Sequence, residues 1–382
     1  MASVYLDHNA TAPLDPAVRV EMDAALDAAD GNPSSVHAAG QAARRILDVA
    51  RARVARLIGA QPEEIVFTSG GTEADNLAVL GCANAPGRER RAIAATAIEH
   101  QAVLNPCRRL AETGRRVAFL GVDRDGVLDL ERARIELPED AGLVSAMLAN
   151  NDVGTIQPVA AAAELAHSRG ALLHTDAVQA AGKIPIDVRA LGVDLLSISA
   201  HKLHGPKGVG ALYVRRGVRL SPLAFGGHQE RGLRPGTENV AGIAGLGKAC
   251  ELAAQRMEGD ARLVRALRDG FEKAIAARVP GARVYGAAAA RLPNTSTVGF
   301  DGVDGELLAI NLDLLGVAVS TGAACSAGSS DPSHVLLAMG RSAVEARSQI
   351  RLSFGRTNTE EEASRAADLV CRAVSILRGV AP

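Results

Sequence analysis

Short apolar runs alternate with stretches of helical periodicity between residues 60 and 215, and this alternation narrows the possible folds more than any other feature. The apolar runs lie at 65–68, 91–96, 143–149, 171–175, 195–199 and 210–214. Runs of this length, bounded by turn residues, predict buried strands. Strands separated by helices predict a largely parallel sheet flanked by helices, so the expected fold class is α/β.

The pattern changes beyond about residue 255. A charged helical stretch at 257–279 is followed by strand patterns at 295–300, 317–320 and 349–354 and by a closing helix at 360–377. A chain of 382 residues also exceeds what one compact domain usually holds. We therefore expect a large domain over 15–255 and a smaller α/β domain over 256–382, which also includes the N-terminal segment 1–14.

Charge and cysteine usage exclude several classes of function. The formal net charge of -1 favours neither nucleic acid nor an anionic membrane as a partner. No apolar run is long enough to span a bilayer, and residues 1–7 do not resemble a signal peptide, so we expect a soluble, cytoplasmic protein. The five cysteines show neither a C-x-x-C pair nor zinc-ligand spacing, which predicts no disulfide framework and no metal site.

Lys202 follows one of the apolar runs and precedes a glycine-rich turn, in the sequence Ser199-Ala200-His201-Lys202-Leu203-His204-Gly205. An amine held at the end of a packed element, away from bulk water, has a lowered pKa and adds to carbonyl groups. This chemistry is typical of enzymes that use pyridoxal phosphate. Ser199 and His201 lie close enough in sequence to contact the same ligand.

Thr72 and Asp176 each follow a predicted strand. Glycines precede Thr72 at the expected start of a helix, a pattern that suits a phosphate, although a simple helix cap explains it equally well. Asp176 would hold a protonated pyridine nitrogen, and Gln179 would donate to the ring oxygen. The structural alternatives are a helix cap for Asp176 and a surface amide for Gln179.

His100 and Asn151 lie beyond two other predicted strands. An imidazole at position 100 would stack on a planar ring and move protons near neutral pH, but a loop histidine is often structural. A turn explains Asn151 as well as a ligand contact does.

Cys325 and Arg351 lie in the second half of the chain. Small residues surround Cys325, which predicts an accessible thiol and favours a nucleophile on a moving loop, with an incidental cysteine as the alternative. Arg351 interrupts an apolar strand. It suits a substrate carboxylate if it points inward, and solvent if its strand lies at an edge.

The ordered set of motifs resembles the cysteine desulfurases, pyridoxal-phosphate enzymes of fold type I, over nearly the whole chain. The matching segments are 5–11, 31–37, 68–75, 99–100, 150–151, 176–179, 199–208, 231–240, 291–295, Cys325, 332–340 and 350–356. The resemblance implies a mostly parallel seven-stranded sheet flanked by helices in the large domain. It also implies a homodimer, L-cysteine as substrate, and a sulfur-acceptor protein such as an iron-sulfur scaffold.

The resemblance also implies a role for each candidate residue. Lys202 would form the Schiff base, Asp176 would pair with the pyridine nitrogen, Gln179 would bind the ring oxygen and His100 would stack over the ring. Thr72, Ser199 and His201 would hold the phosphate, joined by Thr237 of the second subunit. Asn151, also a neighbour of the cofactor, and Arg351 would hold the substrate carboxylate. Cys325 would accept the sulfur as a persulfide while L-alanine leaves.

Two other functions compete with this interpretation. The first is another fold type I enzyme, such as a selenocysteine lyase or an aminotransferase, in which Cys325 is incidental. The second is a non-catalytic homologue that binds or regulates. The chain departs from the usual desulfurase pattern at Asp152, His228, Pro235 and Ala323, and none of these changes removes an expected catalytic group.

Overall fold

The computed structural model describes residues 3–28, 30–322 and 331–379. Its main feature is a seven-stranded sheet with the order β2-β8-β7-β6-β5-β3-β4. The strands are β2 (Ile65–Thr68), β3 (Ala92–Thr96), β4 (Val117–Leu120), β5 (Ala141–Ser145), β6 (Leu172–Asp176), β7 (Leu195–Ser199) and β8 (Gly210–Val214). Only β8 runs antiparallel to its neighbours. The α/β fold with a mostly parallel seven-stranded sheet is confirmed.

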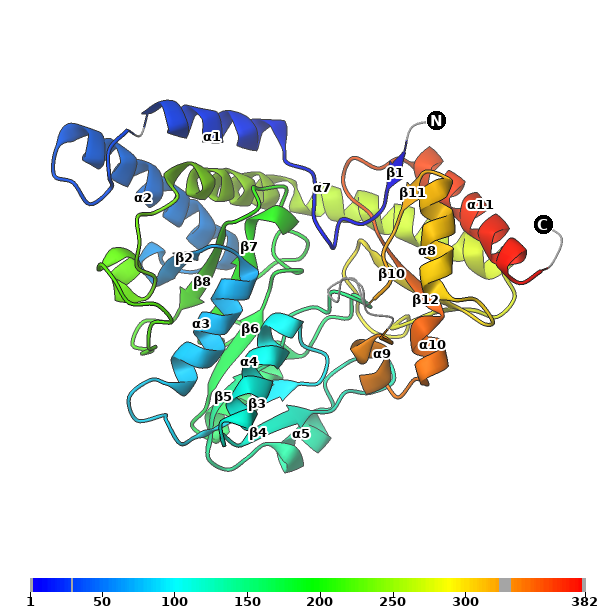
Figure 1. Cartoon of the computed structure of the whole chain (residues 1–382), viewed down its shortest axis with the longest axis horizontal. Coiled ribbons are helices and arrows are strands. Elements are labelled where there is room, and N and C mark those ends of the chain that lie inside the picture. Colours follow the sequence, from blue (N-terminus) through cyan, green and yellow to red (C-terminus); the bar gives the residue numbers. More distant parts are fainter. Residues whose placement is uncertain (1–2, 29, 323–330, 380–382) are drawn as a thin grey trace.

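Helices cover this sheet because its central strands are buried on both faces (Figure 1). They are α1 (Pro16–Ala28), α2 (Ala38–Ile58), α3 (Gly71–Ala83), α4 (Gln101–Glu112), α5 (Leu130–Glu136) and α6 (Val159–Ser168), with short 3₁₀ turns at Pro62–Glu64, Ala200–Lys202 and Gln229–Gly232. The sequence pattern missed β4. This edge strand leaves Phe119 41% exposed, so it lacks a continuous buried run.

The C-terminal part packs around a three-stranded antiparallel sheet in the order β12-β10-β9. Its elements are β9 (Ala282–Val284), β10 (Thr295–Phe300), α8 (Gly305–Leu314), β11 (Val317–Ala318), α9 (His334–Ala338), α10 (Ala343–Arg347), β12 (Gln349–Ser353) and α11 (Glu360–Leu377). The N-terminal strand β1 (Val4–Tyr5) pairs with β11. The start of the chain thus lies beside its last quarter (Figure 1).

Helix α7 (Val240–Arg278) runs through both parts and starts well before the helix expected at 257–279. Its first half is rich in glycine, which weakens the helical signal. The glycines permit close packing: a Cβ at Gly247 would lie 2.6 Å from the Cα of Ala50 in α2. Leu246 belongs to the core of the large sheet and Phe271 to a second core with Phe300. The division into 15–255 and 256–382 with 1–14 therefore falls inside one continuous helix, and we retain it as a proposal.

Among the described residues, none of the helices has the length and apolar character that a membrane crossing requires.

Candidate active site

A cavity of about 240 Å³ lies at the carboxyl ends of β6 and β7, beside the start of α3. The neighbouring carboxyl ends of parallel strands meet at one edge of a sheet, and ligands of α/β proteins bind there. The lining residues are Gly71, Thr72, Asp75, His100, Asn151, Asp176, Val178, Gln179, Ser199, His201 and Lys202. The structure therefore brings together candidates from five separate segments of the sequence.

Lys202 ends the short 3₁₀ turn that follows β7. Its amine donates hydrogen bonds to the backbone carbonyls of Asn9 and Ala10, the latter at 2.7 Å. The N-terminal segment thus fixes the position of the amine, although it lies more than 190 residues away in sequence. This contact holds Lys202 at the edge of the cavity.

The start of α3 forms one end of the cavity. Its N-cap is Gly70, which has no side chain, so the alternative interpretation of Thr72 as the N-cap is wrong. The first backbone N–H groups of α3 and the hydroxyls of Thr72 and Ser199 can bind an anion there. His201 contributes a neutral imidazole, since burial and the charges of nearby lysines lower its pKa to about 4.

Asp176 stands at the end of β6 and is 5% exposed. Its Oδ1 accepts a hydrogen bond of 2.8 Å from the N–H of Val178. Burial raises the pKa of Asp176, and the negative charge of the neighbouring Asp75 adds to the rise. A cation placed beside this carboxyl would reverse that shift and hold Asp176 ionised. The site thus favours a protonated nitrogen next to Asp176.

Glu99 lies fully buried near Asp176 and was not among the predicted site residues. Its Oε1 accepts hydrogen bonds of 2.7 Å from the hydroxyl of Thr96 and from the N–H of Met147. Its Oε2 is buried and has no hydrogen-bond partner in the part of the chain that the structure describes. Burial raises the pKa of Glu99 to about 8. At neutral pH this acid is therefore mostly protonated. The sequence signal was a carboxylate directly before His100 and after an apolar run.

His100 is the N-cap of α4, and its Nδ1 accepts a hydrogen bond of 3.1 Å from the N–H of Ala102. His100 therefore has a structural role as a helix N-cap, which the sequence left open, and it also lines the cavity. Gln179 also lines the cavity rather than the surface, and its amide donates to the carbonyl of Asn9 at 2.9 Å.

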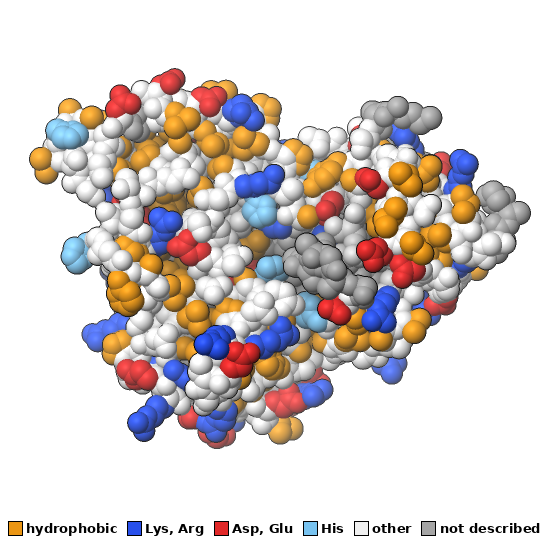
Figure 2. Space-filling model, viewed as in Figure 1, with side chains coloured by type: hydrophobic (Ala, Val, Ile, Leu, Met, Phe, Trp, Pro, Cys, Tyr) orange, Lys and Arg blue, Asp and Glu red, His pale blue; other side chains and the backbone are white. Residues whose placement is uncertain are grey.

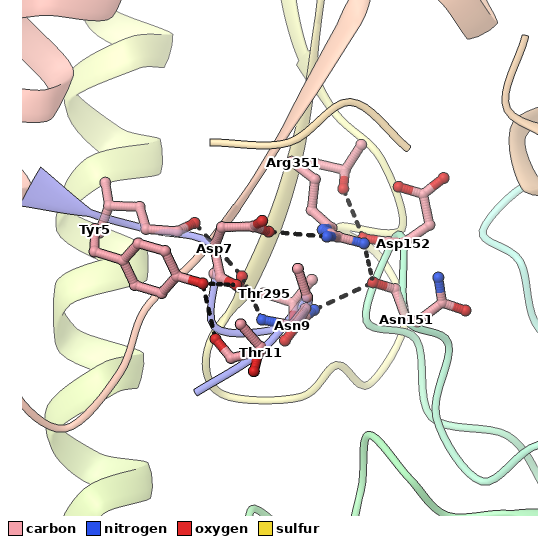
Figure 3. A network of polar contacts seen from close by, with 12 residues as sticks. Tyr5, Asp7, Asn9, Thr11, Asn151, Asp152, Thr295 and Arg351 are labelled. Carbon is pink, nitrogen blue, oxygen red and sulfur yellow. Dashed lines mark hydrogen bonds and ion pairs between the residues drawn. The ribbon is translucent and has the colours of Figure 1, made fainter. Parts of the chain in front are cut away.

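Arg351 on β12 points inward and is 3% exposed, so the solvent-facing alternative is wrong. Its Nη2 lies 3.0 Å from Oδ1 of Asp7, and its Nη1 donates to the carbonyl of Asn151 at 3.1 Å (Figure 3). Arg351 keeps further N–H groups, because a guanidinium carries five. Within the described residues, the Nε of Arg351 and the buried Oδ1 of Asn151 have no hydrogen-bond partner. Both atoms are suited to a polar ligand.

Asn9 connects Lys202 and Gln179 to Asn151 and Thr295. In the sequence it stands out only as part of the family motif at 5–11. Its side-chain amide donates to the hydroxyl of Thr295 at 2.9 Å and to the carbonyl of Asn151 at 3.2 Å (Figure 3). Its backbone carbonyl accepts from Lys202 and Gln179. The sequence signal was a run of polar residues, 7–9, that directly follows an apolar start.

Three predicted site residues are not among those that line this cavity. Arg351 contacts the lining through its hydrogen bond to the carbonyl of Asn151. Cys325 lies outside the described residues. Thr237 is exposed and does not line the cavity of its own chain.

The family model Aminotransferase class-V matches residues 4–365. The chain belongs to this family. It is 50% identical to a protein of Cereibacter sphaeroides named cysteine desulfurase, with 100% of this chain and 98% of that protein covered. It is 46% identical to the cysteine desulfurase NifS of Azotobacter vinelandii, with 100% and 95% covered.

Solved structures show the same fold. A NifS-like protein superposes with a TM-score of 0.91 at 40% identity, with 98% of this chain and all of that chain covered. A structure described as SspA in complex with cysteine gives a TM-score of 0.81 at 34% identity, with 94% and 100% covered. The expected resemblance to cysteine desulfurases and the fold type I architecture are confirmed.

Members of the class-V aminotransferase family generally use pyridoxal phosphate, and the cavity fits that group. Glycine is required at position 71 in the wall of its anion-binding end, because a Cβ there would lie only 2.7 Å from a methyl group of Val178. Its other end carries the buried Asp176, and Lys202 lies at its edge. Hydroxyls and helix N–H groups suit a phosphate, a buried carboxylate suits a pyridinium, and an amine suits an aldehyde.

Proposed function

We propose that this chain is a cysteine desulfurase that uses pyridoxal phosphate to transfer the sulfur of L-cysteine to Cys325, with L-alanine as the other product. The observation that carries the proposal is the single cavity that holds Lys202, the buried Asp176 and the uncapped start of α3. The names of relatives that are 46% and 50% identical over the whole chain support the same activity.

Each residue of the cavity would have its own role in binding the cofactor or the substrate. Thr72, Ser199 and His201 would hold the phosphate, and Asp176 would hold the ring nitrogen. When bound, the cofactor supplies an electron sink that makes the Cα proton of an attached amino acid acidic. Arg351 would bind the substrate carboxylate through its remaining N–H groups, with Asn151 beside it. The amine of Lys202 would take the Cα proton.

Sulfur transfer needs a second nucleophile. The Cys325 thiolate would attack the sulfur of the substrate, so that an S–S bond forms while the Cβ–S bond breaks. A proton delivered to Cβ and the return of a proton to Cα complete L-alanine, and the persulfide stays on Cys325. The enzyme then needs an acceptor for this sulfur, and we propose an acceptor protein such as an iron-sulfur scaffold.

We also propose a homodimer in which Thr237 completes the phosphate site of the partner. Its exposure in its own chain supports this, as does Phe225 in the same loop, which is 90% exposed. Hydrophobic side chains, among them Val20 at 67% exposure, also lie on the surface over α1 (Figure 2). The expected cytoplasmic location stays a prediction.

The test of the activity compares wild type with Cys325→Ser and Lys202→Ala. Wild type should be yellow, release L-alanine from L-cysteine and carry a persulfide. Cys325→Ser should keep the colour but form neither product, and Lys202→Ala should lose the absorbance of the lysine-bound cofactor. Undiminished alanine release by Cys325→Ser would refute the desulfurase assignment.

The test of the dimer mixes two variants that are each impaired on their own. Lys202→Ala and Thr237→Val should each be weakly active alone. In a mixed dimer one site combines the intact Lys202 of one chain with the intact Thr237 of the other, so activity should return. Absence of recovery in a verified mixed dimer would contradict the shared site.

A further inference from the structure

Lys183 lies seven residues after Asp176, at the end of the turn that carries Gln179. Gly182, just before it, has a φ of +72°, in the left-handed region that favours glycine. A Cβ at Gly182 would also lie 2.6 Å from Leu203. The backbone is therefore fixed at this point, and it directs the side chain of Lys183 back toward the site.

The amine of Lys183 lies between two amide oxygens. It donates to Oε1 of Gln179 at 2.9 Å and to Oδ1 of Asn9 at 3.3 Å. The orientation of both amides follows from their other partners. Gln179 Nε2 faces the carbonyl of Asn9, and Asn9 Nδ2 faces the carbonyl of Asn151, and backbone carbonyls only accept. Lys183 thus supplies the donor for Oε1 of Gln179, and it adds a second donor to Oδ1 of Asn9, which also accepts from Nδ2 of Asn294 at 3.0 Å.

This arrangement connects Lys183 to Lys202 through one shared group. The carbonyl of Asn9 accepts from both Gln179 and Lys202, while Lys183 holds the far ends of the Gln179 and Asn9 side chains. A buried amide that loses one partner becomes free to rotate or leaves a polar atom unsatisfied. Removal of the Lys183 amine would therefore loosen the groups around Lys202.

The charged groups that act most strongly on Lys183 are positive, while Asp260 and Arg356 line the same cavity. No ion pair joins Lys183 to a carboxylate within the described part of the chain. The charged groups that act on it are Lys202 and Arg351, and these together with burial lower the pKa of Lys183 to about 7, burial being the largest cause. His8 and His204 also face it, and burial lowers their pKa values to about 3 and about 4, so both stay neutral.

We propose that Lys183 is a positioning residue for the desulfurase reaction: it orders Gln179 and Asn9 beside Lys202, and its positive charge disfavours a second positive charge there. This inference rests on the proposed function. Charge repulsion lowers the pKa of the nitrogen of Lys202 when it is joined to the cofactor. The Nε2 of Gln179 donates one N–H to the carbonyl of Asn9, and its second N–H would act in the same direction by donating to the ring oxygen.

The experiment is a pH titration of the absorbance of the bound cofactor in the purified holoenzyme. Lys183→Met should raise the pKa of the lysine-bound cofactor by up to about one unit, because Lys183 carries its charge mainly below its own pKa of about 7. Its kcat should fall by up to about tenfold, because a pKa shift of one unit and a tenfold change in rate correspond to the same free energy. The KM for L-cysteine should change little, because Lys183 does not contact Arg351.

Two further variants keep the test decisive. Lys183→Arg restores a charged donor and should bring the pKa back toward the wild-type value. Lys183→Gln keeps a donor without the charge, so it should show the raised pKa even if Lys183→Met fails to fold. The matched control is Lys273→Met, which removes an exposed lysine from α7 and should change nothing.

An unchanged cofactor pKa in folded Lys183→Met or Lys183→Gln would overturn the proposal. A raised pKa that Lys183→Arg does not reverse would overturn the role of the charge. Failure of the proposed function is seen separately, since wild type would then neither bind pyridoxal phosphate nor release alanine from cysteine.

Discussion

The guanidinium of Arg351 lies 3.0 Å from the carboxylate of Asp7, which joins two residues 344 positions apart in the chain. The same guanidinium donates to the carbonyl of Asn151 in the large sheet's loops. One buried cation therefore connects the N-terminal segment, the C-terminal sheet and the cofactor cavity. Figure 3 shows Asp7 and Asn151 on either side of this guanidinium.

The Asp7→Asn variant should lose stability. Asparagine keeps an oxygen for Arg351 but removes the charge that balances this buried guanidinium. A hydrogen bond to a charged group contributes about 1.5–3 kcal/mol, so we expect the free energy of unfolding to fall by about that amount. Urea unfolding measures it. Asp301→Asn, at a pair that is about half exposed, should lose no more than about 1 kcal/mol. Equal losses in both variants would contradict the special role of Asp7.

The Arg351→Gln variant should lose its affinity for the substrate carboxylate. Truncation of one partner of a buried charged pair costs about 2–5 kcal/mol, so kcat/KM for L-cysteine should fall about 100-fold or more. We expect most of the loss in KM, measured by steady-state alanine release. Binding of pyridoxal phosphate should persist. An unaltered KM would show that another group holds the carboxylate.

Glu99 should make the cofactor-free protein less stable as the pH rises. The folded chain keeps this proton up to about pH 8, whereas the carboxyl loses it near its ordinary value of 4.5 after unfolding. The folded state thus binds more protons between these values, and stability falls by up to about 1.4 kcal/mol per pH unit there. The loss ends once the pH exceeds the folded pKa.

The measurement compares wild type with Glu99→Gln by urea unfolding at pH 6 and pH 8. Glutamine is neutral at both, so the difference between the two proteins isolates Glu99 from other titrating groups. The variant should gain stability relative to wild type at pH 8. Glu112→Gln, an exposed position on α4, is the control and should show no such gain. A constant difference between wild type and Glu99→Gln would contradict the raised pKa.

Cys325 should be the one fast-reacting thiol. The other four cysteines are buried, and burial raises the pKa to about 11 for Cys82 and to about 12 for Cys107 and Cys250, with Cys371 also raised. Thiols with such values carry almost no thiolate at pH 7. Brief treatment with iodoacetamide followed by peptide mapping should therefore label position 325 alone. Fast labelling of native Cys325→Ser would refute this.

Much of the site could be predicted because it depends on local sequence. Thr72, Asp176 and Ser199 each end or follow a strand, and parallel strands bring such positions to one edge. The apolar runs predicted these strands, except for the half-exposed β4. The closing helix was predicted with its observed limits, because its apolar face and its first-turn glutamates are clear signals.

The remaining features required the tertiary structure. Lys202 carries a plausible chemistry in the sequence, but the carbonyls that hold its amine come from the N-terminal segment. The ion pair of Arg351, the junction at Asn9 and the contacts of Lys183 likewise join distant parts of the chain. Residue types alone do not encode these partners, since each contact forms only when separate elements pack together.

The sequence by itself thus determined the fold class, the order of the motifs and the kinds of functional groups. Hydrophobic periodicity and residue chemistry are local properties, and they need no knowledge of distant neighbours. Only the tertiary structure decided which groups are buried, which way their hydrogen bonds run and how their pKa values shift. Burial and electric fields arise from every element packed around a group, as the protonated Glu99 shows.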